Sequence, residues 1–147
     1  KTHDGDFCYD CVAVSEEQIA PNVWKYGLGI ALQIDREPKN PVCFLDRKKE
    51  DGGMTIEEFQ MSIDARPRSS VWKTGMVLSN CAGTIYEPYT GEISAVFYHV
   101  IPDMPRYKVG DRVIQIKLGF TLPMEFVEVE DLDPTDRGNN GYGSTGK

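Results

Sequence analysis

The fold of this chain is restricted most by its many short runs of β-branched and aromatic residues, which proline and glycine separate. Such runs predict strands because these side chains suit a pleated, half-buried surface. We expect strands at residues 7–14, 25–34, 42–45, 59–63, 93–100, 112–118 and 126–130. One capping box at 55–59 predicts about one turn of helix. Strands this short and this numerous predict an all-β sandwich or barrel.

The composition indicates one globular domain. The chain has 147 residues, of which 40% are hydrophobic and 27% are charged, so it can bury a sizeable core. We find no signal peptide and no apolar run near the ~20 residues that cross a bilayer, so we expect a cytoplasmic protein without a membrane partner. The net charge of −7 argues against general nucleic-acid binding, which requires a basic face. A few local cations can still hold an anionic nucleotide.

Four cysteines raise the question of a metal or redox site. Cys8 and Cys11 form a C-x-x-C pair, but a zinc site needs about four ligands at set spacings. Cys43, Cys81 and the two histidines are scattered, and residues three apart on a strand point to opposite faces. We therefore expect buried thiols in a reducing cytosol.

The last twelve residues, 136–147, combine four glycines with groups that suit a phosphate ligand. Glycine lets the backbone approach a ligand closely, and successive N–H groups can form a concave anion site. Arg137 offers a planar fork to phosphate, and Ser144 and Thr145 add hydroxyl donors. Tyr142 offers a flat face on which a base can stack. Composition alone favours a disordered linker, and a P-loop at 141–147 would need a preceding strand and a following helix, which we do not expect.

The sequence divides into a β domain at residues 1–130 and a linker with a glycine-rich arm at 131–147. Within the domain, residues 35–57 form a highly charged insertion. We expect this insertion to be a solvated excursion rather than a partner site.

Five segments resemble, in order, the five motifs of the trimeric dUTPases. The segments that carry the resemblance are 7–13, 67–70, 80–93, 110–116 and 137–146. The resemblance implies a distorted jelly-roll-like β-barrel and a homotrimer in which the arm of one subunit closes over a site between two others. It also implies hydrolysis of dUTP to dUMP and pyrophosphate, by attack of water on the α-phosphate.

The resemblance assigns candidate site residues as well. Around the triphosphate it implies Arg68, Ser69, Ser70, Gln115, Arg137, Ser144 and Thr145. Around the base and sugar it implies Asn80, Gly83, Ile85, Tyr89, Tyr142 and Gly143. Asp10 corresponds to an aspartate that holds Mg²⁺ through water, which suits an ion that keeps several waters and bridges phosphates.

One departure from the motifs affects the chemistry. The third motif of the family contains an aspartate that orients the attacking water, and Tyr86 occupies that position here. Tyrosine, with a pKa of about 10, is a poor base near neutral pH. We hypothesise that Glu87, the next residue, positions the water together with Gln115.

Two other functions follow from the same residues. In the first, Tyr86 makes hydrolysis slow, and the protein is a nucleotide-binding relative of the dUTPases that senses or sequesters its ligand. A dCTP deaminase-like enzyme would share the Arg-Ser-Ser sequence at 68–70, but it carries a catalytic glutamate in the strand after the third motif. Val96 stands where we would place that glutamate, so the sequence argues against deamination.

Overall fold

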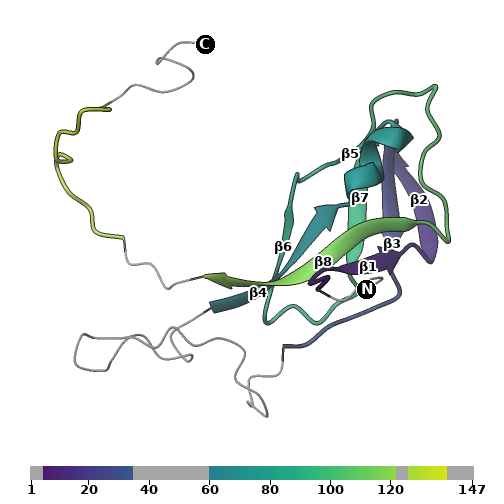
Figure 1. Ribbon diagram of the computed structural model, residues 1–147, viewed down its shortest axis with the longest axis horizontal. Helices are drawn as coiled ribbons and strands as arrows, with labels where there is room; N and C mark the ends of the chain where they lie inside the picture. The colour runs from purple at the N-terminus through teal and green to yellow at the C-terminus, as the bar shows by residue number, and fades with distance from the viewer. Residues whose placement is uncertain (1–4, 35–59, 122–125, 139–147) are drawn as a thin grey trace.

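Two antiparallel sheets of four strands face each other (Figure 1). The structure is a computed structural model that describes residues 5–34, 60–121 and 126–138. Within these ranges one short 3-10 helix, η3 (Ser69–Thr74), accompanies the strands. This architecture confirms the all-β, jelly-roll-like prediction. In the same ranges, no helix combines the length and the apolar character that crossing a membrane requires.

Each sheet is built from strands that are distant in the sequence. The first sheet has the order β1-β8-β4-β6, formed by Tyr9–Val12, Arg112–Thr121, Gln60–Pro67 and Gly83–Tyr86. The second has the order β2-β3-β7-β5, formed by Ser15–Ala20, Val23–Gly27, Ser94–His99 and Met76–Leu78. The long strand β8 pairs with both β1 and β4, so it fixes the register of the first sheet.

The core lies between the two sheets and has an aromatic centre. Tyr26 and Phe97 are fully buried, and Tyr107 is 5% exposed. The three rings pack edge to face, with centroids 5.5 to 6.2 Å apart. Edge-to-face contacts bring the positive ring edge against the negative face of its neighbour. These contacts hold the loop before β8 against the second sheet.

The predicted strands are mostly present, with shifted ends. Predictions at 7–14, 59–63, 93–100 and 112–118 correspond to β1, β4, β7 and β8. The prediction at 25–34 corresponds to β3, which starts two residues earlier and ends at Gly27. The prediction at 42–45 and the helical turn at 55–59 lie outside the described residues.

The strand predicted at 126–130 is wrong for this single chain. Residues 126–130 form no strand, and the side chains of Phe126 and Val127 are 88% and 75% exposed. The alternating pattern is there, but no neighbouring strand of the described chain pairs with it. A strand needs such a partner to satisfy its backbone groups.

Four elements were not predicted from the sequence: β2, β5, β6 and η3. In β2 five of six residues are exposed, so the strand has no apolar alternation to reveal it. A turn signal does precede β3: Pro21 and Asn22 join β2 to β3, and Asn22 has a φ of 58°. Proline followed by a residue at positive φ is typical of a type II turn.

Candidate active site

Side chains from the first and fourth motifs, and from the residue just before the second, meet on the outer face of the first sheet. Asp10 on β1, Gln115 on β8 and Arg66 on β4 are register partners, so they form one row across three strands. Paired residues of antiparallel strands point to the same face. The adjacent pair Cys11 and Ile114 points into the core. The register therefore brings polar residues from distant parts of the sequence together.

Asp10 is the centre of an ion-paired cluster. Its carboxylate accepts hydrogen bonds from Arg68 Nε at 2.8 Å and from Arg112 Nη1 at 3.0 Å. Arg68 Nη1 also donates to Ser70 Oγ at 3.4 Å. The side chains of Arg68 and Asp10 are 25% and 27% exposed, so the pair is accessible to a ligand from solvent. A phosphate group can accept from the same guanidinium groups, which suit its geometry.

The turn with the two predicted serines follows β4 directly. Ser69 is exposed and Ser70 is half-buried, and both lie in the first turn of η3 after Arg68. Gln115 Nε2 donates to the carbonyl oxygen of Pro67 at 3.3 Å, where β4 ends. The structure thus brings together the predicted phosphate-binding residues Arg68, Ser69, Ser70 and Gln115.

A pocket of about 440 Å³, which we call the basic pocket, lies beside this cluster. Its lining includes Arg68, Ser70, Lys73, Thr74, Tyr107 and Arg112. Arg106 also lines the pocket, whereas Asp111 is its one acidic lining residue among those described. In a chain with a net charge of −7, this local excess of cations makes the pocket suitable for an anionic ligand.

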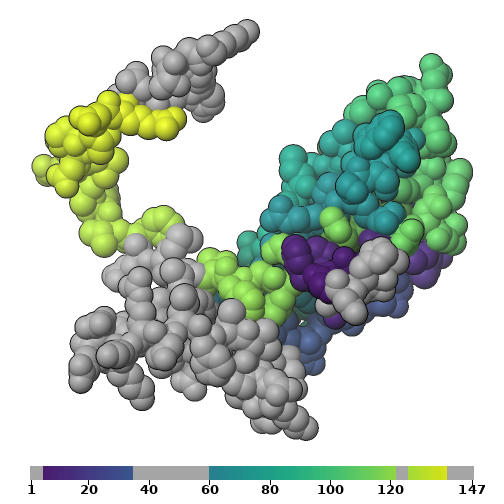
Figure 2. Space-filling view, viewed as in Figure 1, coloured from purple at the N-terminus to yellow at the C-terminus, as the bar shows by residue number. Residues whose placement is uncertain are grey.

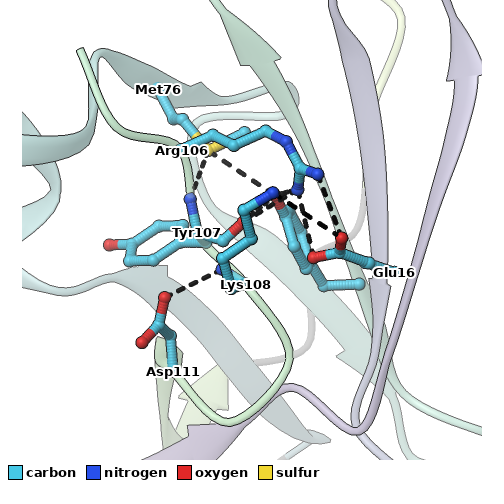
Figure 3. A network of polar contacts seen from close by, with 7 residues as sticks. Glu16, Met76, Arg106, Tyr107, Lys108 and Asp111 are labelled. Atoms are coloured by element: carbon cyan, nitrogen blue, oxygen red, sulfur yellow. Dashed lines mark hydrogen bonds and ion pairs between the residues drawn. The ribbon is translucent and has the colours of Figure 1, made fainter.

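A polar network anchors the loop that forms one wall of the basic pocket (Figure 3). Arg106 donates two hydrogen bonds to Glu16, both of 3.0 Å, and its guanidinium lies 3.5 Å from the centroid of the Trp24 ring. Arg106 and the Tyr26 hydroxyl each donate to the carbonyl oxygen of Tyr107 at 2.9 Å. The hydrogen bond from Arg106 holds the pKa of Glu16 below its ordinary value, so the pair stays ionised.

A second pocket, of about 170 Å³, lies beside β6 and the turn before it, and we call it the hairpin pocket. Its lining includes three predicted base-binding residues, Asn80, Gly83 and Ile85. Val96 also lines it, and no carboxylate is among its described lining residues. Deamination needs a carboxylic acid at this place, so the alternative of a dCTP deaminase-like enzyme is not favoured.

The turn after β6 holds the ring of Tyr89 in one place. The Tyr89 hydroxyl donates to the carbonyl oxygen of Glu92 at 3.0 Å, and its backbone N–H donates to Tyr86 at 3.0 Å. Gly91 lies under the ring, where an added Cβ would be 2.7 Å from the hydroxyl oxygen. The Glu92 carboxylate in turn accepts from Gly29 N at 2.9 Å. The turn is therefore attached to the segment that follows β3.

Tyr86 and Glu87 lie away from the phosphate residues of the same chain. Tyr86 is paired with Ser62 on β4, whereas Gln115 is paired with Arg66. Four residues of strand separate the two pairs, which corresponds to about 13 Å. Within one chain, Glu87 and Gln115 are not brought together around one water.

The described part of the arm stands clear of the sheets (Figure 2). Residues 126–138 are all exposed, and Arg137 lies near their end. The other predicted arm residues, Tyr142, Gly143, Ser144 and Thr145, lie outside the described residues. The same holds for the charged insertion at 35–57.

The cysteines only partly meet the expectation of buried thiols. Cys11 is buried, and burial raises the pKa of its thiol, whereas Cys8 is half-buried. Cys81 is exposed in the turn before β6, where its φ is 57°. These three thiols are free, and Cys43 lies outside the described residues. In the part of the chain that the structure describes, no three potential ligands are placed to hold a metal.

Sequence reasoning missed part of the basic pocket. Lys73, Arg106 and Tyr107 lie outside the residues quoted for the second and fourth motifs. A signal was present for Arg106 and Tyr107, since they precede the fourth motif with only Lys108 and Val109 between. Nothing in the local pattern indicated that this segment and η3 would face one pocket.

The environment of Asp10 determines how a magnesium ion fits. One carboxylate supplies the acidic oxygens, and both oxygens already accept from arginine. Two guanidinium charges disfavour a bare cation at this place. The residues fit a hydrated Mg²⁺ that arrives with the phosphates and contacts Asp10 through water.

Comparison with known proteins identifies the family. The dUTPase family profile matches residues 59–146. The deoxyuridine 5'-triphosphate nucleotidohydrolase of Corynebacterium glutamicum is 41% identical over 149 residues, covering 100% of this chain and 85% of that protein. The protein of the same name from Nautilia profundicola is 36% identical, covering 69% of this chain and 73% of that protein. The match to the Finegoldia magna protein, at 42% identity, covers 57% of this chain and spans 59% of that protein. The chain belongs to the dUTPase family.

Solved structures share the fold. A dUTPase of Staphylococcus bacteriophage 80alpha with dUpNHpp has a TM-score of 0.69 at 17% identity, covering 100% of this chain and 90% of that chain. The dUTPase from phage phi11 of S. aureus has a TM-score of 0.61 at 15% identity, covering 92% and 90%. A mutant phi11 enzyme is described with a structural Mg(II) ion. At these identities the likeness establishes the fold alone.

Proposed function

We propose that this chain hydrolyses dUTP to dUMP and pyrophosphate. The observation that carries the proposal is the cluster of Asp10, Arg68, Ser70 and Arg112 beside the basic pocket, to which β1, β8 and η3 with its N-cap residue contribute. Cations are concentrated there although the chain as a whole is acidic. This is the arrangement that binding of a triphosphate requires. The relatives named as dUTP nucleotidohydrolases carry the same function.

The reaction needs little covalent chemistry from the protein. A water oxygen forms a bond to the α-phosphorus, and the bond from that phosphorus to the oxygen shared with the β-phosphate breaks. Arg68 and Arg112 neutralise charge on the phosphates, while Ser69, Ser70 and Gln115 add neutral donors. Catalysis then rests on positioning and on charge stabilisation of the transition state.

The hairpin pocket takes the base in this proposal. The loop with Asn80, Gly83 and Ile85 contacts uracil largely through its backbone groups. Tyr89 lies under the deoxyribose. The ring of Tyr89 leaves no room for a 2′-hydroxyl, because Gly91 and the bond to Glu92 keep it in place. The enzyme therefore selects deoxyribose over ribose.

A homotrimer supplies the complete site. The basic pocket and the hairpin pocket have no lining residue in common. The exposed apolar side chains of Phe126 and Val127 at the end of the β domain, and of Leu132 in the linker, suit a contact with another subunit. One subunit then contributes the phosphate residues, a second the base pocket with Tyr86 and Glu87, and a third the arm with Arg137, Tyr142, Gly143, Ser144 and Thr145.

Asp10 is the residue that would hold a hydrated Mg²⁺ in this scheme, and the ion would supply further charge neutralisation on the phosphates. Glu87 and Gln115, from two subunits, position the attacking water, and Tyr86 lines the same space. We expect the protein to act in the cytoplasm, without nucleic acid or membrane as partner.

A screen of deoxynucleoside triphosphates, with UTP as the ribonucleotide comparison, tests the proposal. The full chain is incubated with each triphosphate and Mg²⁺, and released pyrophosphate is measured. We expect release from dUTP well above release from dCTP, dTTP and UTP, and a loss of about 10²-fold or more for Arg68→Ala. Binding of dUTP without any release would favour the nucleotide sensor instead, and equal release from all triphosphates would contradict the assigned base pocket.

A further inference from the structure

The strongest unexplained feature of the described chain is the hydroxyl of Tyr107. It is the one buried side-chain oxygen or nitrogen among the described residues that has no hydrogen-bond partner. Buried polar atoms nearly always have a partner, and an exception calls for an explanation by a ligand or a water. The residue itself is 5% exposed, so solvent does not satisfy the hydroxyl.

The rest of Tyr107 is held rigidly. Its ring packs against Tyr26 and Phe97 at centroid distances of 6.2 and 5.5 Å. Its backbone N–H donates to Met76 Sδ at 3.4 Å, and its carbonyl oxygen accepts from Arg106 and Tyr26 at 2.9 Å. The position of the hydroxyl is therefore fixed, and the residue cannot turn to find another partner.

Tyr107 is part of the wall of the basic pocket. Tyr107 lines that pocket with Arg68, Ser70 and Thr74. Figure 3 shows the hydroxyl at the far end of the ring from the pair of Arg106 and Glu16. Burial raises the pKa of the phenol, and the nearby positive charge of Arg68 counteracts part of that effect, so the proton stays on oxygen at neutral pH.

Thr74 is a polar neighbour but an inadequate partner. Its side chain lies near enough to lower the pKa of Tyr107, although the geometry between the two hydroxyl groups is not that of a hydrogen bond. Its hydroxyl donates at 2.6 Å to the carbonyl oxygen of Val71 and accepts from Met76 N at 3.3 Å. The Tyr107 proton thus stays available to an acceptor that enters the basic pocket.

We propose that Tyr107 is an additional anion-binding residue, whose hydroxyl donates to an oligophosphate oxygen, directly or through one water. The proposal rests on the proposed function, since it needs phosphate in the basic pocket. A neutral donor fixed in the same pocket as Arg68 adds a directed hydrogen bond to the charge of the arginine and lysine side chains. It also explains why the aromatic core tolerates a hydroxyl at this place, where phenylalanine would pack without a desolvation cost.

The test compares affinity with stability in Tyr107→Phe. Calorimetry with inorganic pyrophosphate and Mg²⁺ on the full chain should give an affinity about tenfold weaker than that of the unaltered protein. The melting temperature should stay the same or rise, because an unsatisfied buried hydroxyl has been removed. A purely structural role for the hydroxyl predicts a lower melting temperature for Tyr107→Phe. It also predicts that the folded variant binds pyrophosphate as tightly as the unaltered protein does.

Two further variants complete the design. Tyr26→Phe removes a core hydroxyl that is bonded to Tyr107 and does not line the basic pocket, so it should lower stability and leave pyrophosphate affinity unchanged. Arg68→Ala should abolish most binding. If Arg68→Ala weakens binding and Tyr107→Phe does not, the inference is overturned while the proposed function stands. If the unaltered protein binds neither pyrophosphate nor dUpNHpp, the proposed function falls and the inference falls with it.

Discussion

At the scale of single residues, we expect Tyr86 to limit the rate of the proposed reaction. Its side chain is 71% exposed at the end of β6, at the position where the resemblance to the third motif implies an aspartate. Tyr86→Asp should raise kcat for dUTP by about 10²-fold or more, because a carboxylate can accept a proton from water at neutral pH. Pyrophosphate release measures the gain. Thr90→Asp, which adds the same charge in the neighbouring turn, should give none, and an equal gain there would remove the special role of position 86.

Glu87 is the residue that we expect to replace the missing aspartate. Glu87→Gln keeps the size of the side chain and removes the base, so kcat should fall by about 10²-fold or more while KM changes little. Glu92→Gln is the matched control, since glutamine can still accept from Gly29 N. Undiminished turnover in Glu87→Gln would exclude this carboxylate from the mechanism.

Gly91 determines where the Tyr89 ring lies. In Gly91→Ala the new methyl group would be 2.7 to 3.2 Å from three atoms of that side chain, so the ring must move. The preference for dUTP over UTP, measured as a ratio of kcat/KM values, should fall by about tenfold or more. Thr90→Ala, in the same turn, should leave the ratio as it is. A retained ratio in Gly91→Ala would mean that Tyr89 does not exclude the 2′-hydroxyl.

At the scale of elements, the pair of Glu16 and Arg106 fastens the loop before β8 to the edge strand β2. The side chains are 25% and 15% exposed, so solvent weakens the pair but does not remove it. Glu16→Gln should lower the free energy of unfolding at pH 7 by about 1 kcal/mol. Denaturation in urea measures the change, and Glu17→Gln on the same strand should have almost no effect.

The same pair predicts a pH dependence. The pKa of Glu16 in the folded protein lies below its ordinary value of 4.5 because of the hydrogen bond from Arg106. The stabilisation is therefore complete above pH 4.5 and is lost as the pH falls through the lower, folded-state pKa. The difference between the unaltered protein and Glu16→Gln should shrink below pH 4.5. A difference that stays constant into the acid range would show that the charge of Glu16 is not its source.

The elements differ in how well the sequence predicts them. The strands β4, β7 and β8 carry β-branched and aromatic runs and were predicted, although their ends shift by a few residues. The edge strands β2 and β6 and the three-residue β5 were missed, because they owe their conformation to pairing with a neighbour. Exposed residues such as those of β2 carry no alternation that a local reading can detect.

At the scale of the whole molecule, the division of the site between subunits can be tested directly. Arg68→Ala has a defective phosphate site and an intact arm, whereas a chain ending before Asp136 has the reverse. Co-expressed in equal amounts, the two inactive forms should recover about a quarter of full activity, since each mixed trimer has one intact site. Mixing the two separately purified proteins without subunit exchange is the control. No recovery, with mixed oligomers verified by mass, would contradict a shared site.

The sequence by itself determined the β class and most of the central strands. Local pattern is enough for these, because alternation and turn residues are encoded within a few positions. The candidate site residues came mainly from the resemblance of five segments to the dUTPase motifs. The sequence also drew attention to Tyr86, because a departure from a motif can be read from the amino-acid sequence alone.

Only the tertiary structure decided which of these residues meet. The register of β1, β8 and β4 placed Asp10, Gln115 and Arg66 in one row, and it separated Tyr86 from them along β4. The partnerless hydroxyl of Tyr107 and the unpaired residues 126–130 were likewise decided there. Pairing and burial depend on segments that are distant in the chain, so no local pattern contains them.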